Sequence, residues 1–398
     1  MSVRKRSWKT AKGEEKTAWV VDYFDVKGAR RHKSFAKKKE ADAFSAVAKV
    51  EVQDGTHVAD RASATVKKAA DFWLATVEAA GRERTTLDSY RSHVNLHISP
   101  FIGDLRLNAL NIPTVRAFED DLRKGGRSPA LTRKILVSLG SLLADAQERG
   151  LTSQNVVRDM RGRRKGGEKR QEKRRKGRLK VGVDIPTRDE VRALVGALSE
   201  RWRPLLLTAI FSGLRASELR GLRWSDVDQK RREIRVHQRA DRFGDIGAPK
   251  SETSERTVPV PPMVLNALKE WKLACPKGEA DLVFPNGSGK VEQLNNIVRR
   301  GLQPSLVSAG VTIDTGDLDE DRNPVVVAKY TGMHALRHFY ASWCINRKED
   351  GGLGLPPKVV QERMGHSTIT MTMDVYGHLF PRGDDAEEMA AAERSLLG

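Results

Sequence analysis

The sequence predicts a multi-domain, mainly α fold, with a small β-sheet-plus-helix module at the N-terminus and a mixed α+β domain towards the C-terminus. Three observations lead to this fold class. The length of 398 residues is enough for about two or three domains. Apolar residues recur at helical spacing over most of the chain and alternate as in strands only in short segments. A basic stretch with almost no apolar side chains separates two folded parts.

Composition indicates a polyanionic partner in a reducing compartment. The formal net charge of +19 makes nucleic acid the first candidate, although a protein that is merely basic remains the alternative. No long amphipathic segment, signal peptide or membrane span stands out, so we expect no membrane partner. Cys275 and Cys344 lack metal-binding spacing and are expected to be buried small residues. We therefore expect a cytoplasmic protein with access to DNA.

Residues 1–60 are predicted to form a small β-rich module. The alternation that begins at Trp19 predicts a strand, and a turn at Gly28 leads to a second strand over Arg30 to Phe35. A helix that ends at Gly55 follows. Four apolar residues are expected on its inner face: Ala41, Phe44, Val47 and Ala48. The many Lys and Arg residues favour contact with DNA, with a solvated basic surface as the alternative.

Residues 64–155 are predicted to form a compact helical domain. Apolar stripes define four amphipathic helices, whose first residues lie near Val66, Leu87, Pro113 and Ser128. After this domain, residues 156–185 are predicted to be an extended basic linker, because their composition cannot bury enough apolar surface to fold alone. Contact with phosphates would release counterions, so we expect the linker to follow a DNA backbone; a solvated spacer is the alternative.

Residues 186–383 are predicted to form the mixed α+β domain. Thr187 and Glu190 have the spacing of a helix capping box at its start. Two strands are predicted on either side of a loop, over Arg232 to Arg239 and Ser254 to Val260.

Three segments complete the chain. The acidic segment Asp314 to Arg322 is expected to be a loop that lies away from DNA, and it has no assigned role. Pro324 to Lys329 is predicted to be a short strand or an extended connector. Residues 384–398 form a helical tail pattern, which either docks on a neighbouring protomer or remains a free amphipathic tail.

Three short motifs collect arginines, histidines and one tyrosine. The first contains Arg215, the second contains His334 and Arg337, and the third contains His366 with Tyr376 ten residues further on. Each of these residues alone is more often structural than functional. Together they suit attack on a phosphodiester, because guanidinium groups bind the charged non-bridging oxygens and histidines move protons.

Two further requirements of this chemistry concern protons. A tyrosine with an ordinary pKa near 10 needs a base or a positive pocket before it attacks at neutral pH. The leaving 5′ oxygen needs a proton, which Lys250 in the loop between the two predicted strands can supply if its pKa is lowered. An exposed loop lysine is the alternative for Lys250.

The sequences of these motifs resemble those of the tyrosine recombinases of the phage integrase family. Four segments carry the strongest resemblance, within a span of about residues 60–385: Phe211 to Leu219, Pro249 to Val260, His334 to His338, and Met364 to Phe380. A fifth segment, Ile102 to Leu107, resembles part of the family's helical core-binding domain. The resemblance therefore implies a catalytic domain of the tyrosine recombinase type over residues 186–383.

By this resemblance, Tyr376 would form a 3′-phosphotyrosyl bond and release a 5′ hydroxyl, with Lys250 as the general acid. Four residues would bind and polarise the scissile phosphate: Arg215, His334, Arg337 and His366. Glu218 would support the first arginine, with a helix-surface carboxylate as the alternative, and His338 stays outside the catalytic set as a structural residue. Because the covalent bond stores the energy of the phosphodiester, no metal or nucleotide cofactor is expected.

The resemblance also implies roles for the domains. Residues 1–60 resemble an arm-type DNA-binding module and residues 64–155 the core-binding (SAM-like) domain, so one chain would bridge two double-stranded DNA sites. Four protomers would assemble on the DNA and exchange the tails at residues 384–398, and directionality or DNA-bending factors could take part. The implied function is site-specific recombination in the bacterial nucleoid, which integrates or excises a mobile element such as a prophage or genomic island.

Two alternative functions remain open. A resolvase or a strand transferase of the type IB topoisomerase kind would use similar chemistry, but the N-terminal module favours an integrase. A non-catalytic DNA-binding relative would keep the fold, but the presence of all six predicted catalytic residues argues against it.

Overall fold

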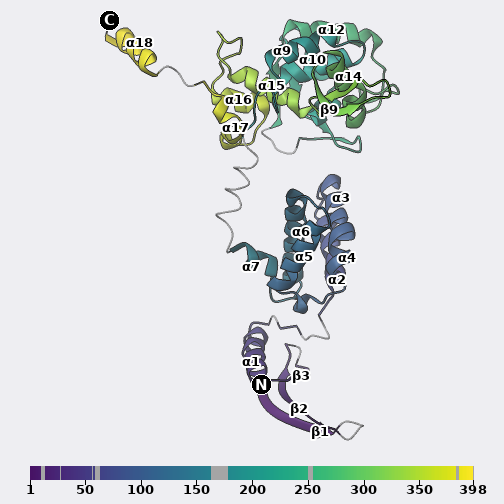
Figure 1. Ribbon diagram of the computed structural model, residues 1–398, viewed down its shortest axis with the longest axis vertical. Coiled ribbons are helices and arrows are strands. Elements are labelled where there is room, and N and C mark those ends of the chain that lie inside the picture. The colour runs from purple at the N-terminus through teal and green to yellow at the C-terminus, as the bar shows by residue number, and fades with distance from the viewer. Residues whose placement is uncertain are drawn as a thin grey trace. The chain divides into compact units, whose positions relative to one another are not determined.

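The computed structural model describes residues 1–9, 14–26, 28–55, 57–58, 63–162, 178–249, 254–381 and 385–397. The chain divides into two compact units, Met1–Arg175 and Lys176–Gly398, which are labelled by element in Figure 1. Buried apolar side chains of the described residues form two clusters in the first unit and one larger cluster in the second. The predicted multi-domain, mainly α fold class is confirmed.

The N-terminal module is an antiparallel sheet covered by one helix. Its strands are β1 (Ser2–Lys9), β2 (Glu15–Phe24) and β3 (Arg30–Phe35), in the order β1-β2-β3, and the helix is α1 (Lys38–Gln53). Strands β2 and β3 and the helix were predicted, whereas β1 was not. Strand β1 lacks an apolar alternation because it is an edge strand that is exposed along most of its length. Val47 was expected to face the sheet and is 53% exposed, since three strands cover only a narrow face of α1.

The helical part of the first unit contains the four expected helices. They are α2 (Val66–Ala79), α3 (Arg84–His93) with its continuation η1 (Val94–Ile98) and α4 (Ser99–Ile102), α5 (Ile112–Lys124) and α6 (Pro129–Glu148), with a short 3-10 turn η2 (Leu107–Ala109). The side chains of Asn111 and Ser128 accept hydrogen bonds at the starts of α5 and α6, which fixes where these helices begin. Large buried residues such as Trp73, Phe118 and Leu139 fill the space between the helices.

A fifth helix, α7 (Val156–Gly162), corrects the predicted boundary at residue 155. Val156, Val157 and Met160 are buried in the same core as α5 and α6, so the first seven residues of the expected linker belong to the helical domain. The other end of the expected linker also differs, because Ile185 is fully buried in the core of the second unit. Residues 163–177, which contain most of the basic stretch, lie outside the described residues.

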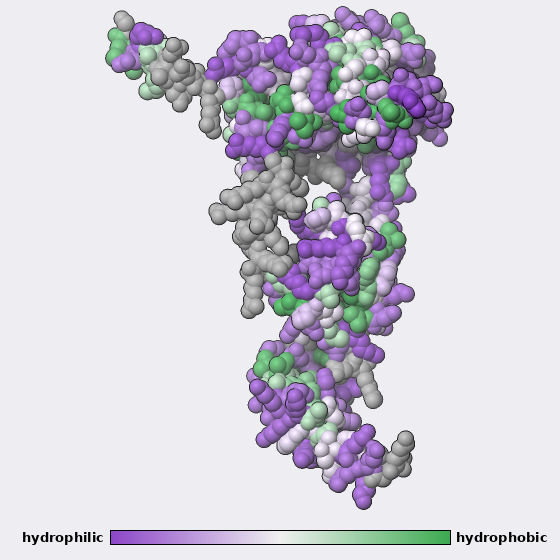
Figure 2. Space-filling view, in the orientation of Figure 1, coloured by the Kyte–Doolittle hydropathy of each residue, from purple (hydrophilic) through white to green (hydrophobic). Residues whose placement is uncertain are grey.

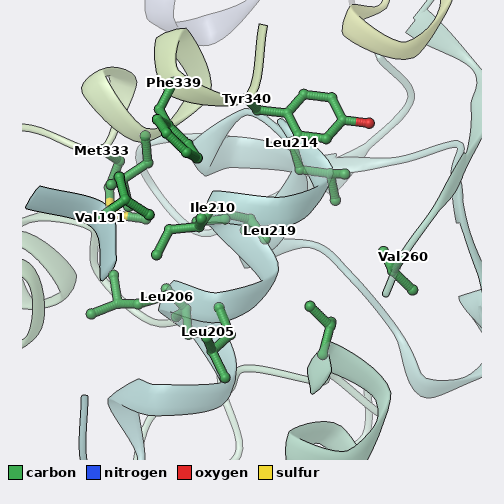
Figure 3. Packing of buried hydrophobic residues seen from close by; sticks show 14 of the residues in the cluster. Val191, Leu205, Leu206, Ile210, Leu214, Leu219, Val260, Met333, Phe339 and Tyr340 are labelled. Atoms are coloured by element: carbon green, nitrogen blue, oxygen red, sulfur yellow. The ribbon is translucent and has the colours of Figure 1, made fainter. Parts of the chain in front are cut away.

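The second unit begins with helices that surround a buried central helix. These are α9 (Arg188–Ala197), α10 (Trp202–Ser212) and α11 (Ala216–Arg220), with the turn η3 (Trp224–Asp226). The predicted capping box is confirmed, since Thr187 Oγ1 accepts from the Glu190 backbone and Glu190 accepts from the Thr187 backbone. Helix α10 is apolar on nearly all sides because α12 and α15 pack against it. Figure 3 shows Leu205, Leu206 and Ile210 of α10 inside this core.

Short strands lie beside these helices. The sheet β4-β5-β8 consists of β4 (Val227–Asp228), β5 (Glu233–Val236) and β8 (Arg256–Pro259), and a separate pair consists of β6 (Arg239–Ala240) and β7 (Ile246–Gly247). The strand pairs confirm the two strands predicted around a loop. Lys250, in that loop, lies outside the described residues, which resume at Ser254.

The described remainder of the second unit contains mainly helices, joined by loops, and a β-hairpin. Its elements are α12 (Pro262–Ala274), α13 (Leu294–Asn296), η5 (Ile297–Leu302), α14 (Gln303–Ser308), β9 (Thr312–Leu318), β10 (Pro324–Ala328), α15 (His334–Ile345), α16 (Pro357–Met364), α17 (Ile369–Tyr376), η6 (Gly377–Leu379) and α18 (Asp385–Leu397). The acidic segment Asp314 to Arg322 was predicted to be a loop. This prediction is wrong in part, because residues 314–318 belong to β9. Ile313 and Val327 pair across the hairpin, and the Thr315 hydroxyl donates to the Val325 carbonyl.

Hydrophilic side chains cover much of the visible surface of both units (Figure 2). Of the helices in the described part of the chain, none has both the length and the apolar character needed to cross a membrane.

Candidate active site

The first predicted arginine is placed by a tight turn between two helices. Gly213 ends α10 with φ +63°, and a Cβ there would collide with the Tyr340 ring, so both conformation and space require glycine. The chain then enters α11 at Arg215. The Arg215 guanidinium donates to Glu218 Oε1 at 2.8 Å and to the Gly365 carbonyl at 2.8 Å. Arg215 thereby joins the first motif to the third, 150 residues further along the chain.

The second predicted arginine is buried and is affected by the charge of the first. Arg337 on α15 is only 3% exposed and donates to the carbonyls of Gly213 and Met364. Burial and the neighbouring charge of Arg215 lower the pKa of Arg337 to about 9, which leaves it protonated at neutral pH. Both of its partners are neutral carbonyls, so its positive charge is not cancelled by these contacts.

A buried ion pair holds this arginine framework in place. Glu218 is 2% exposed and accepts two hydrogen bonds from Arg256, at 2.8 and 3.1 Å. Burial alone would raise the pKa of Glu218, but the hydrogen bond and charge of Arg256, with the charge of Arg215, outweigh burial and lower it to about 2. The expected support of Arg215 by Glu218 is therefore present, and the alternative of a surface carboxylate is wrong.

Arg256 is a residue of the site to which the sequence analysis assigned no role. Besides Glu218, it donates to the carbonyls of Arg363 and Ser254, at 2.8 and 2.9 Å. A Cβ at Gly365 would lie 2.7 Å from the Arg256 guanidinium, so this glycine allows the close approach. Arg256 thus connects β8, next to the loop that contains Lys250, to the helices that carry the other motifs.

The two predicted histidines lie close enough to the arginines to be affected by their charges. His334 begins α15, and His366 follows the end of α16 and donates to or accepts from Thr372 Oγ1 at 2.9 Å. Burial, followed by the charges of Arg337 and Arg215, lowers the pKa of both histidines, that of His366 to about 4. Both imidazoles are therefore neutral at pH 7, able to donate one hydrogen bond and accept another.

Tyr376, at the last turn of α17, lies inside the protein. It is 2% exposed, its ring stacks on His366 at a centroid distance of 6.1 Å, and its hydroxyl lies 2.7 Å from His338 Nδ1. Burial raises the pKa of Tyr376 to about 12, although Arg337 and Arg215 act in the opposite direction. The phenol is thus protonated in this arrangement.

His338 is the second residue that the sequence analysis left out of the site. Its ring packs edge-on against that of His334, with a centroid distance of 4.6 Å, and its Nδ1 forms the hydrogen bond with the Tyr376 hydroxyl. Burial, together with His334 and Arg337, lowers its pKa to about 4. The spacing of His334 and His338, four residues apart on one helix, places them on the same face and was a signal for this contact.

The second unit therefore brings five of the six predicted residues together: Arg215, His334, Arg337, His366 and Tyr376. Three guanidinium groups, those of Arg215, Arg256 and Arg337, face one carboxylate, that of Glu218. The group thus carries two more positive charges than carboxylates, an excess that favours the binding of an anion in the pocket.

Comparison with known proteins agrees with this chemistry. Residues 186–382 match the sequence profile described as the phage integrase family. A tyrosine recombinase XerC-like protein of Caldanaerobacter subterraneus subsp. tengcongensis is 25% identical over 363 residues, which cover 87% of each chain. The ICEBs1 integrase of Bacillus subtilis is 23% identical over 317 residues, which cover 76% of each chain.

Solved structures share the fold. The Tn1549 transposon integrase, in complex with a circular intermediate DNA, has a TM-score of 0.59 at 19% identity, and the match covers 83% of this chain and 99% of that chain. A lambda integrase tetramer bound to a Holliday junction has a TM-score of 0.54 at 16% identity, with 92% and 96% coverage.

Fold, pocket and sequence matches together define a site-specific DNA recombinase. The chain belongs to the phage integrase family, the tyrosine recombinases. The predictions of family, of enzyme class and of general function are confirmed.

Proposed function

We propose that this recombinase is an integrase that cleaves and rejoins DNA through a 3′-phosphotyrosyl bond at Tyr376, and thereby integrates or excises a mobile element. The observation that carries the proposal is the pocket in which the charges of Arg215 and Arg337 act on the Tyr376 phenol, and in which these two guanidinium groups and that of Arg256 share the single carboxylate of Glu218. Such a pocket binds a phosphodiester and stabilises the charge that develops on it during attack.

The reaction is an exchange of phosphodiester bonds. The Tyr376 oxygen forms a bond to the scissile phosphorus, the bond from phosphorus to the 5′ oxygen breaks, and the DNA 3′ phosphate stays on the tyrosine. The phenolic proton passes to a neutral imidazole of the pocket, and Lys250 gives a proton to the leaving 5′ oxygen. Attack by a 5′ hydroxyl of a second strand reverses these steps and rejoins the DNA.

The remaining predicted residues act on the phosphate. Arg215 and Arg337 bind its non-bridging oxygens, and their positions are set by contacts to backbone carbonyls and to Glu218. His334 and His366, both neutral, donate further hydrogen bonds to the same oxygens as charge develops. None of these steps requires a metal ion or a nucleotide.

Double-stranded DNA is the proposed partner of both units. Similar solved structures are of an integrase in complex with DNA and of a lambda integrase tetramer bound to a Holliday junction, and the net charge of +19 supports the same substrate. We assign core-type sites to the helical domain and the second unit, and arm-type sites to residues 1–60. Four protomers assemble on the DNA, with the tails from residue 384 exchanged between them, and directionality or DNA-bending factors select the direction. An enzyme of this kind acts in the bacterial cytoplasm, at the nucleoid.

A chromosomal resolvase is the second candidate function. It is favoured by the XerC-like name of the relative that matches 87% of the chain. The integrase is favoured by the N-terminal sheet-and-helix module and by the names of other relatives, the ICEBs1 integrase and the prophage integrase IntR of Escherichia coli.

Two experiments test the proposal. DNA junctions between the chromosome and any mobile element beside the gene are sequenced to define the attachment sites, and a nicked suicide substrate that carries the core site is incubated with the protein in EDTA. We expect a covalent adduct whose DNA-linked peptide contains Tyr376. An adduct at another residue, or an absolute requirement for metal, would contradict the mechanism; junctions without a mobile element would favour the resolvase.

A further inference from the structure

Helix α17, which carries Tyr376, is a short helix that buries part of its surface in the second unit. Thr372 and Tyr376 are its buried residues, one helical turn apart, and each makes one hydrogen bond to a histidine, at 2.9 and 2.7 Å. Three apolar side chains of the same helix are more than two-fifths exposed: Ile369, Met371 and Met373. Two residues of this helix thus tie it to the histidines of the site by side-chain hydrogen bonds, while part of its apolar surface stays exposed.

In its buried position, the Tyr376 hydroxyl cannot attack a DNA phosphate. With 2% of its surface exposed, its hydroxyl cannot touch the phosphorus of a DNA strand that lies outside the protein. Attack requires the phenol to move outward, and the hydrogen bond to His338 Nδ1 must break when it does.

We propose that His338 is a latch for the nucleophile: its Nδ1 accepts the hydrogen bond of the Tyr376 hydroxyl and keeps the phenol inside the protein until DNA is bound. The proposal rests on the proposed role of Tyr376 as the nucleophile. His338 is a positioning residue in this scheme, since it acts on the phosphate only through Tyr376.

The pKa shifts of Tyr376 and His338 indicate that His338 holds the phenol in its protonated form and does not remove its proton. The pKa of Tyr376 is raised to about 12 and that of His338 is lowered to about 4. Both shifts disfavour transfer of the proton from the phenol to the imidazole in this arrangement. His334, Arg337 and Asp184 also act on His338, and the two cations that act on Tyr376 are Arg337 and Arg215. The hydrogen bond is therefore one between two neutral groups, and the latch assigns the role of donor to the phenol.

The tautomer of His338 follows from this assignment. A neutral imidazole that accepts at Nδ1 carries its proton on Nε2. A ring without nitrogen at this position would keep the edge-on packing against His334 but would lose the acceptor. An asparagine would lose the ring but would keep an acceptor close to the position of Nδ1.

The latch is tested by chemical labelling of the full-length protein without DNA. Tetranitromethane nitrates accessible tyrosines, and the five tyrosines of the chain are resolved by peptide mass spectrometry. Tyr340, which is 1% exposed, reports on the integrity of the fold. In the His338→Phe variant we expect the nitration rate of Tyr376 to rise about tenfold, the equivalent of one hydrogen bond, while Tyr340 stays protected. In the His338→Asn variant we expect a rate close to that of the unaltered protein.

A nitration rate of Tyr376 that is unchanged in His338→Phe overturns the latch. If Tyr340 also becomes reactive in that variant, His338→Leu is judged by the same criterion. Because the labelling contains no DNA, its result is separate from the proposed function, whose failure would appear as the absence of a Tyr376 adduct in the unaltered enzyme. On a suicide substrate, the freed phenol is expected to raise the initial rate of adduct formation in His338→Phe, whereas His338→Asn restores the rate of the unaltered enzyme.

Discussion

The two sides of the pocket, the guanidinium side and the phenol side, are held in different ways. Arg337 is buried and bonded to two backbone carbonyls, and Arg215 is fixed by Glu218, which Arg256 clamps in turn. Tyr376, by contrast, sits at the end of a short helix on which Ile369, Met371 and Met373 are exposed. Figure 1 shows this helix, α17, next to α16 at the edge of the second unit.

This difference separates two tasks. A group that binds the phosphate gains from a fixed position, because no reorganisation is then needed as charge develops. A nucleophile that becomes joined to DNA has to travel with it, and a weakly attached helix can do so at low cost in free energy. We therefore expect substitutions on the guanidinium side to affect transition-state binding and substitutions on the phenol side to affect access.

The largest expected effect comes from Tyr376→Phe. Loss of the hydroxyl removes the proposed attacking atom, so covalent adducts on a suicide substrate should fall at least about 10⁴-fold, while the arginine framework and DNA affinity should remain. Adducts are measured by gel electrophoresis under denaturing conditions and affinity by mobility shift. Adducts that persist in this variant would reject the assignment of the nucleophile.

Arg337→Lys tests the fixed side. A lysine keeps the positive charge but lacks the planar guanidinium that donates to the carbonyls of both Gly213 and Met364. We therefore expect adduct formation to fall about 10²–10³-fold with little change in DNA affinity. Arg192→Lys on α9 is the matched control, since that arginine side chain is 74% exposed. Equal rates in the two variants would show that the fixed geometry of Arg337 does not matter.

Glu218→Gln tests the clamp through stability. Because the folded-state pKa of Glu218 is lowered from 4.5 to about 2, its contribution to stability is complete above about pH 4.5 and is lost as the pH falls towards 2. The lowering corresponds to about 3 kcal/mol, good to its order of magnitude. Denaturant unfolding of the variant should show a stability loss of that order at pH 7, and a smaller difference from the unaltered protein at pH 3. Glu362→Gln, at an exposed position of α16, is the control; a loss independent of pH would contradict the account.

These contrasts also mark what could be predicted from the sequence. Arg215, Arg337, His366 and Tyr376 were found because their residue types recur in short, recognisable motifs. The ion pair between Glu218 and Arg256 joins residues that are 38 positions apart, and a local sequence pattern does not predict such a contact. His338 was set aside because its role depends on the phenol being buried, which is a property of the packed fold.

Secondary structure shows the same limit. The helices with strong apolar periodicity, such as α5 and α6, were placed from their stripes and caps. Strand β1 and helix α7 were missed because one is a polar edge strand and the other borders the basic stretch, so neither has a long apolar pattern of its own. Backbone pairing and the tertiary core, rather than local periodicity, stabilise both.

The smallest effect on cleavage is expected from removal of residues 1–60. The core of the helical domain begins at Ala64, and the described part of the pocket lies wholly in the second unit, so adduct formation on a core site should stay within about twofold. Recombination between complete attachment sites should fall much further, because the bivalent gain from a second DNA site is lost. Both rates are measured on the same preparations, with a deletion of residues 385–397 for comparison. Unchanged recombination would reject the arm-site role of the module, and a large loss of core-site cleavage would mean that the pocket depends on a part of the chain with which it shares no core.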